Sequence, residues 1–129
     1  MILTLSLPPC INQTYGVNRN ASHPMYKRKI VKDWEFTAGW EVKKQLVEAN
    51  RFVKKNGEPD STPIKGDVKV GITWYYRINR DIDAGLKVLL DLLQKQNVYE
   101  NDRQVREIMY IKILRDIKNP RVEVVIYEM

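Results

Sequence analysis

The sequence predicts an α/β (α+β) domain in which a small mixed β-sheet is flanked by two main helices. The chain has 129 residues and is 43% hydrophobic, which suits one domain, spanning residues 1–129, with a true core. Apolar residues alternate along residues 67–76, as in a half-buried strand. They recur at helical spacing along 27–54 and 83–96. The expected order of elements is β-α-β-α-β-β.

The N-terminal part is predicted to be a strand followed by a long loop. Residues 2–7 have no basic residue before their apolar part, so they indicate a strand and not a signal peptide. Pro8-Pro9 ends that strand, and residues 8–24 form a polar loop. Loops of this length in small domains are often functional, although a mobile surface loop is the alternative. The side chains that suit contacts with a DNA backbone here include Asn12, Tyr15 and Arg19.

The first predicted helix spans residues 27–54. Its apolar face consists of Trp34, Ala38, Val42, Leu46, Ala49 and Val53. Gly39 is expected to bend or split the helix. The lysine pairs Lys43-Lys44 and Lys54-Lys55 are expected on its outer side. A loop then covers residues 56–63.

The second half alternates strand and helix signals. The inward face of the strand at 67–76 is predicted to be Val68, Val70, Ile72, Trp74 and Tyr76. A polar break at 77–83 leads into the helix at 83–96, whose apolar positions are Leu86, Leu89, Leu90 and Leu93. A turn at 97–102 precedes two strands, 104–114 and 121–128. In the last strand, Val122, Val124 and Ile126 share one face.

The composition excludes several kinds of chemistry. Cys10 is the sole cysteine, so neither an internal disulfide nor a cysteine zinc site is possible. His23 is the sole histidine and lies in a polar, Pro-containing segment, which favours a loop position over catalysis. No apolar run is long enough to span a membrane. These features suit a reducing, intracellular compartment, and so a cytoplasmic location.

The positive charge is concentrated at one end of the chain. The net charge is +6, and residues 1–55 carry ten Lys/Arg but four Asp/Glu, whereas residues 56–129 carry twelve of each. Such a one-sided excess favours a polyanionic partner. A solvated basic face that maintains solubility is the alternative. The cations nearest the loop, and so the expected DNA contacts, are Arg19, Lys27, Arg28 and Lys29.

Asp81 and Asp83 are the strongest candidates for a functional site. They are separated by one residue where a strand ends and a helix begins, so both carboxylates can face one point. Mg²⁺ prefers oxygen ligands of this kind. A metal held there could polarise a scissile phosphate and lower the pKa of an attacking water. The alternative is that one of these aspartates caps the helix N-terminus.

Lys87 and Asp102 become candidate site residues only in combination with Asp81 and Asp83. Lys87 lies four residues after Asp83 and four before Asp91, which fits either ordinary i, i+4 ion pairing or an ammonium near a metal site. Asp102 follows Asn101 in a dipeptide typical of turns. No periodicity places Asp102 near Asp83.

Taken together, these motifs resemble the RusA family of Holliday junction resolvases. Residues 80–93 resemble the family's Asp-x-Asp-Asn, Lys and apolar helix, and residues 98–105 resemble its turn with Asp followed by x-Gln-Val. Leu7-Pro8-Pro9 and Asn12 resemble its opening strand and loop. The resemblance covers most of the chain, with the motifs in the right order and spacing.

The resemblance implies a RusA-like fold and a homodimer that makes paired nicks in four-way DNA junctions during recombination or repair. It implies that the enzyme uses Mg²⁺, with Mn²⁺ as a substitute, in the cytoplasm of a bacterial or phage-infected host cell. It implies that Asp81, Asp83 and Asp102 are catalytic, metal-binding acids. It makes Lys87 a catalytic or phosphate-contacting lysine and Arg80 a DNA contact. Candidate dimer surfaces are residues 86–93 and the strand around Met109-Tyr110, with the monomer core as the alternative for both.

One departure from the family pattern stands beside the acids. Ala84, followed by Gly85, replaces the amide that the family often has after the second aspartate, so the positioning of the site or of the DNA is in question. Two other functions remain open: a protein that binds branched DNA without cutting it, and a metal nuclease that acts on flaps, forks or RNA.

Overall fold

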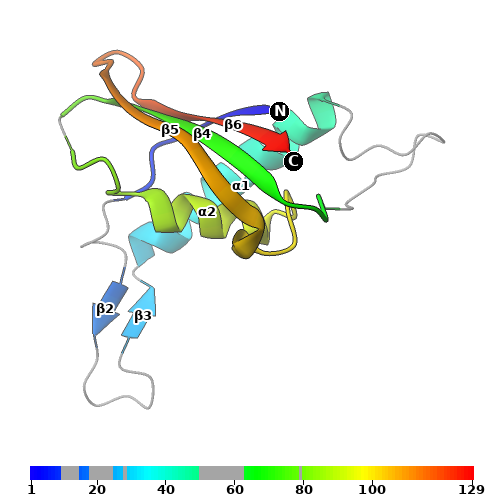
Figure 1. Cartoon of the computed structure of the whole chain (residues 1–129). Coiled ribbons are helices and arrows are strands. Elements are labelled where there is room, and N and C mark those ends of the chain that lie inside the picture. The colour runs from blue at the N-terminus through cyan, green and yellow to red at the C-terminus, as the bar shows by residue number, and fades with distance from the viewer. Residues whose placement is uncertain (10–14, 18–24, 28, 50–62, 79) are drawn as a thin grey trace.

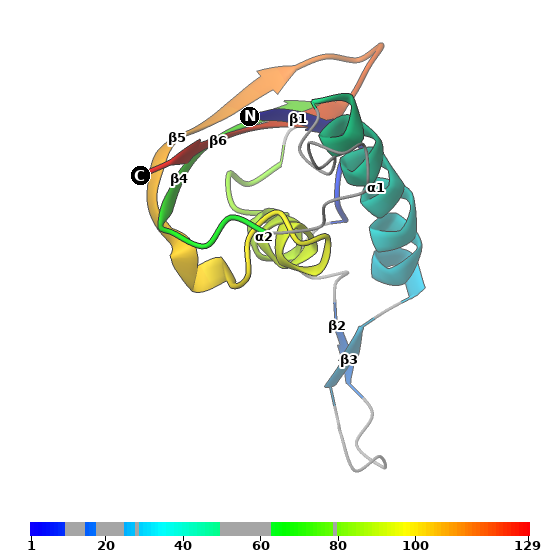
Figure 2. The ribbon, with the colours of Figure 1, turned by 90° about the vertical axis from the view of Figure 1, so that its right-hand side faces the viewer.

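In the computed structural model, a four-stranded mixed sheet carries both helices on one face (Figures 1 and 2). The structure describes residues 1–9, 15–17, 25–27, 29–49, 63–78 and 80–129. The strands of this sheet, in spatial order, are β1 (Ile2–Leu5), β6 (Arg121–Glu128), β4 (Val68–Tyr76) and β5 (Val105–Arg115). β4 pairs with β5 in parallel, while the β4–β6 and β1–β6 pairs are antiparallel. The predicted α+β class and mixed sheet are confirmed.

β4 is the central strand and confirms the alternation seen in the sequence. Its five predicted inward residues, from Val68 to Tyr76, are all buried. The opposite face is also largely covered, because Thr73 is buried and Tyr75 half-buried. Part of that cover comes from Tyr110 of β5, which packs over Gly71: a Cβ on Gly71 would lie 2.4 Å from the Tyr110 ring. The predicted inward face of β6 is likewise buried.

Helix α1 (Lys29–Glu48) is shorter than predicted. It is not split at Gly39, where the side chain of Gln96 packs so closely that a Cβ would lie 2.6 Å from its amide nitrogen. Trp34, Ala38, Val42 and Leu46 form the buried face as expected. Ala49 is exposed, so its place on that face was wrong, because the helix ends before it. Residues 50–55, with Val53 and the second lysine pair, lie outside the described residues.

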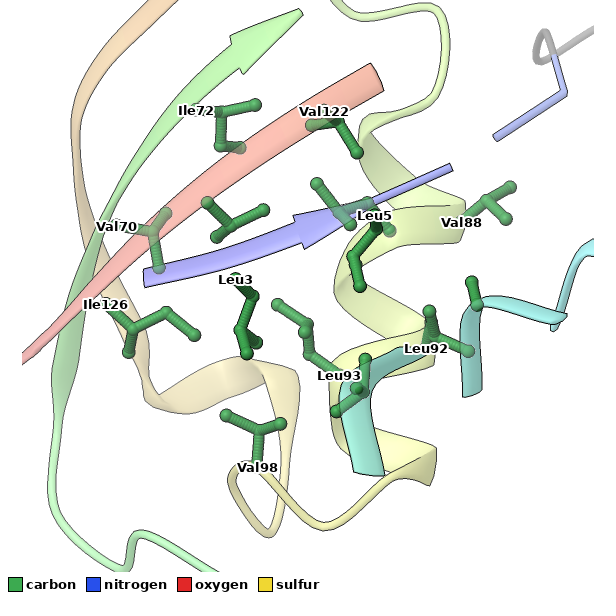
Figure 3. Close-up of a cluster of buried hydrophobic side chains, with 14 of the residues drawn as sticks. Leu3, Leu5, Val70, Ile72, Val88, Leu92, Leu93, Val98, Val122 and Ile126 are labelled. Carbon is green, nitrogen blue, oxygen red and sulfur yellow. The ribbon is translucent and has the colours of Figure 1, made fainter. Parts of the chain in front are cut away.

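Helix α2 (Leu86–Lys95) begins three residues later than predicted. Its buried face is Val88, Leu89, Leu92 and Leu93, so Leu86 and Leu90 are only half-buried. Val88, Leu92 and Leu93 belong to one buried cluster with residues of β1, β4 and β6, and in Figure 3 Leu93 points toward Leu3 while Val88 and Leu92 lie on the other side of α2. The core is therefore the layer between the sheet and the helices. The apolar residues of α2 belong mainly to this core and not to an interface.

The N-terminal loop prediction was wrong in one respect. Tyr15–Val17 (β2) and Met25–Lys27 (β3) form a small antiparallel ribbon, which stands apart from the main sheet (Figures 1 and 2). Three-residue strands are too short for periodicity to reveal among turn-forming residues. Lys27 therefore belongs to a strand and not to the predicted helix. Cys10, His23 and the predicted loop at 56–62 lie outside the described residues.

A turn and a short 3-10 helix connect α2 to β5. Asn97 adopts a left-handed conformation (φ 58°) just after the helix, which agrees with the predicted turn at 97–102. The 3-10 helix η2 (Asp102–Gln104) follows, and β5 begins directly after it. Among the described helices, neither α1 nor α2 has the length and apolarity needed to cross a membrane.

Candidate active site

Asp81 and Asp83 lie on a tight turn between β4 and α2. The backbone N–H of Ala84 donates to the carbonyl oxygen of Asp81 (3.1 Å), and that of Leu86 donates to the carbonyl of Asp83 (3.2 Å). Both aspartates are exposed. Gly85 occupies the N-cap position without a side-chain cap, so neither aspartate caps the helix and that alternative was wrong. The two carboxylates are left to face solvent on a hydrogen-bonded turn.

The turn is anchored by aromatic residues of β4. The indole N–H of Trp74, which is fully buried, donates to the carbonyl oxygen of Ile82 between the two aspartates (3.0 Å). The ring of Tyr76 stacks on that of Trp74 and carries the guanidinium of Arg80 5.2 Å from its centroid. Arg80 also donates to the carbonyl oxygen of Pro8 (3.3 Å). Arg80, which was predicted to contact DNA, therefore links the turn to Tyr76 and to Pro8.

Pro8 makes a second contact that explains the small residues after Asp83. An ideal Cβ on Gly85 would lie 2.5 Å from Cγ of Pro8, which leaves no room for any side chain. Ala84 is itself buried. The pair Ala84-Gly85 thus lets the N-terminal segment pack against the start of α2. The departure from the family's amide accompanies this close packing.

One face of α2 connects the aspartate turn to the Asp102 turn. Lys87, Asp91 and Gln94 follow i, i+4, i+7 spacing and so lie along one side of the helix. The ammonium of Lys87 lies 3.3 Å from Oδ2 of Asp91, and the lysine side chain is largely exposed. At the far end, Oε1 of Gln94 accepts a hydrogen bond from the backbone N–H of Asp102 (2.9 Å).

Asp102 is held by a hydrogen-bonded capping box. The side chain of Asn101 accepts from the backbone N–H of Arg103 (2.9 Å), and Oε1 of Gln104 accepts from that of Asn101 (2.8 Å). The amide nitrogen of Gln104 also donates to the carbonyl oxygens of Ile64 (2.8 Å) and Gly66 (2.7 Å). Asp102 is half-buried as a result. The predicted turn chemistry is confirmed, and Gln104 ties the turn to the segment before β4.

The surroundings of Tyr99 bring a further acid, Asp91, into the candidate site. From the sequence, Asp91 was considered only as an ion-pair partner of Lys87. This tyrosine is fully buried, and its hydroxyl donates to the carbonyl oxygen of Leu90 (2.7 Å). Burial raises the pKa of Tyr99, and the negative charges of Asp102 and Asp91 raise it further. Both carboxylates are therefore within electrostatic reach of one phenol. The i+8 spacing of Asp91 from Asp83 was the only signal in the sequence.

Asp81, Asp83 and Asp102 do not meet at one point. Across the described ranges, no three Asp, Glu, His or Cys side chains lie close enough to hold a metal ion. Asp83 lies just before the N-terminus of α2. The backbone N–H of Asp102, in contrast, donates to the side chain of Gln94 near the C-terminus of α2. At 1.5 Å per residue, Lys87 and Gln94 are separated by about 10 Å along the helix. The assignment of these acids to metal therefore stays a prediction.

The predicted DNA contacts fall into three groups. Asn12, Arg19 and Arg28 lie outside the described residues. Tyr15 and Lys27 are register partners in the β2–β3 ribbon. Lys29 is exposed at the first position of α1, and Lys43 and Lys44 are exposed further along, as expected for the outer side. Their contact with DNA stays a prediction.

The fold and the turns define a class of protein: a small α+β domain that presents carboxylates and cations beside the end of its central strand. Comparison with family models makes the class specific. The model described as Endodeoxyribonuclease RusA matches residues 8–127. The chain therefore belongs to the RusA family of endodeoxyribonucleases, which are Holliday junction resolving enzymes. A search of curated proteins found no match to the chain.

Proposed function

We propose that this protein resolves four-way DNA junctions by paired, Mg²⁺-dependent nicks, as a homodimer in the cytoplasm. One observation carries the proposal: a RusA-family chain presents Asp81 and Asp83 to solvent on an anchored turn. Within the described residues, neither carboxylate accepts a hydrogen bond or forms an ion pair. Uncompensated carboxylates beside basic residues suit a cation-dependent reaction on a phosphate.

The donor atoms fit Mg²⁺, with Mn²⁺ as a substitute. Asp81 and Asp83 would hold the ion through carboxylate oxygens, and Asp102 would join them only if its turn moved toward theirs. When bound, the metal would polarise the scissile phosphate and lower the pKa of the attacking water. The contribution of the chain is to keep the two aspartates on a backbone that Trp74 and Pro8 hold still.

Lys87 is proposed to contact the phosphate that is cut. Its ammonium is held by Asp91 on the helix face that follows Asp83. An ammonium in that place stabilises negative charge that develops on the phosphate. The exposed lysines of α1 would contact phosphates farther from the cut.

The dimer is proposed from symmetry and from the edge of the sheet. A four-way junction has near two-fold symmetry, so a C₂ dimer presents it with two equivalent sites. In the described sheet, β5 is an edge strand of 11 residues with Ile108 exposed. Such edges are usually covered by another element. Sedimentation at micromolar concentration tests this, and a monomeric mass would contradict pairing by a preformed dimer.

Cleavage of a synthetic four-way junction is the decisive experiment. With Mg²⁺, the unaltered protein should make symmetric nicks, while Asp83→Asn should reduce the cleavage rate by at least about a thousandfold, because metal stabilisation is worth several kcal/mol. Junction binding should persist. Asp67→Asn is the matched control, since Asp67 is an exposed acid at the other end of β4. Normal cutting by Asp83→Asn would show that the site is wrong.

A second function is favoured by the separation of the acids along α2. If Asp102 does not join Asp81 and Asp83, the protein would bind branched DNA without cutting it. Junction binding without nicks in either Mg²⁺ or Mn²⁺ would support this function. A panel of flap, fork and RNA substrates would identify a nuclease of different preference.

A further inference from the structure

A cleft lies where the parallel strands β4 and β5 end side by side. Its volume is about 510 Å³, within the roughly 300–1,000 Å³ typical of small-ligand sites. It is lined by Tyr76, Arg77, Ile78, Ile113, Leu114 and Arg115. Tyr76 and Arg115 are register partners at the ends of the two strands. The chain then runs from this cleft directly into the turn that carries Asp81 and Asp83.

One part of the cleft is cationic. Arg77 and Arg115 are both exposed, and among the described residues neither is in an ion pair. Asp116 follows Arg115 directly, but its carboxylate is taken up by the guanidinium of Arg121 (2.8 Å) and by backbone N–H groups of the following turn. Two guanidinium groups at one cleft suit the oxygens of a phosphate.

The other part of the cleft is apolar and open to solvent. Ile78 is 76% exposed and Leu114 is 48% exposed. Ile113, which also lines the cleft, packs against the hydrophobic core. Apolar surface of this kind next to two arginines matches the two halves of a nucleotide, a flat base and a charged phosphate. A stacked duplex presents only base edges and cannot insert a base face into such a cleft.

We propose that this cleft binds one unstacked nucleotide of the branched DNA substrate. Its base would lie against Ile78 and Leu114, and its phosphate would bind Arg77 and Arg115. Bases at a branch point have already lost part of their stacking, so withdrawing one there is easier than from a continuous duplex. The cleft would thereby distinguish branched from linear DNA a few residues from the predicted cutting site. This inference rests on the proposed function.

Two double variants separate the base contact from the phosphate contact. Ile78→Ser with Leu114→Ser removes the apolar surface, and Arg77→Gln with Arg115→Gln removes the charges. Arg106→Gln is the control, because Arg106 is an exposed arginine at the opposite end of β5. All four positions in the variants are exposed or partly so, and thermal unfolding verifies that each variant folds. Binding is measured without divalent metal, on a four-way junction with 2-aminopurine at the crossover and on a linear duplex of the same sequence.

The serine variant should lose about tenfold in junction affinity, keep its duplex affinity and lose the 2-aminopurine fluorescence increase. The glutamine variant should reduce the steepness of log K against log salt by about 0.9, because the neutralisation of one phosphate is lost. The control should bind both DNAs as the unaltered protein does. If the serine variant binds the junction normally, or weakens duplex binding equally, the inference is wrong.

A parallel cleavage assay distinguishes this failure from failure of the proposed function. If the unaltered protein cuts the junction while the serine variant binds it normally, only the nucleotide cleft is disproved. If the unaltered protein neither binds nor cuts the junction, the proposed function is wrong and the cleft inference falls with it.

Discussion

The two turns that carry the predicted metal-binding acids are held in place by different physical means. The turn with Asp81 and Asp83 is held largely by packing, in which Trp74 and Pro8 press on backbone that has no room for larger residues. The turn with Asp102 is held by hydrogen bonds from polar side chains, chiefly Gln94 and Gln104. Close packing fails abruptly when an atom is added, whereas a hydrogen-bond network loses stability one bond at a time.

Gly85→Ala should have the largest effect on the packed turn. The new Cβ would lie 2.5 Å from the Pro8 ring, so the turn or the N-terminal segment must shift. Overpacking of this kind costs about 1–3 kcal/mol of stability. A displacement of about 1 Å at the acids would lower the cleavage rate about a hundredfold. Junction cleavage and urea unfolding measure the two effects.

Gly66→Ala is the matched control for that variant. No heavy atom lies within 4 Å of an ideal Cβ on Gly66, and Gly66 is exposed to solvent. Its stability should stay equal or rise by up to about 1 kcal/mol, because alanine restricts the unfolded chain. Equal cleavage by both alanine variants would show that packing against Pro8 does not position the acids.

Gln104→Ala should have an intermediate effect on the hydrogen-bonded turn. It removes three hydrogen bonds, two of them to the segment before β4, and should reduce the free energy of unfolding by about 2 kcal/mol. Asn101→Ala removes the local cap alone and should cost about 1 kcal/mol. Urea unfolding ranks them. A larger loss in Asn101→Ala would mean that local capping, and not the tie to Ile64 and Gly66, holds Asp102.

Tyr99→Phe should have the smallest effect, and that effect should depend on pH. The pKa of Tyr99 is raised in the folded protein above its ordinary value of about 10, so the neutral phenol stabilises the fold. This stabilisation is complete below pH 10 and is lost as the pH rises further, because the unfolded chain ionises first. Near neutral pH, Tyr99→Phe should be less stable by about 1 kcal/mol through loss of the bond to Leu90.

Above pH 10, the unaltered protein should lose stability relative to Tyr99→Phe, until its advantage disappears. Urea unfolding of both proteins at pH 7, 9 and 10.5 measures the difference. A difference that stays constant across this range would show that the buried phenol does not oppose ionisation.

Strand faces and the Asp102 turn could be predicted because they depend on neighbours in the chain. The inward residues of β4 follow from period-two alternation, and the turn follows from Asn101-Asp102 with a glutamine nearby. The packing of Pro8 on Gly85 could not be predicted, since it joins residues far apart in the sequence. The same holds for Asp91, whose position near Tyr99 depends on how the turn after α2 folds back. The helix limits were missed because exposed polar ends lack periodicity.

The parallel pairing of β4 with β5 has a consequence for how the site comes into existence. Parallel neighbours require a long crossover, and here that crossover contains the aspartate turn, α2 and the Asp102 turn. The nucleotide cleft lies at the end of the same strand pair. Contacts between strands that are distant in sequence form late in folding, because the connection must first close. Docking of β5 onto β4 therefore forms the cleft, so a chain with an unpaired β5 would keep the aspartate turn and α2 but would have no nucleotide cleft.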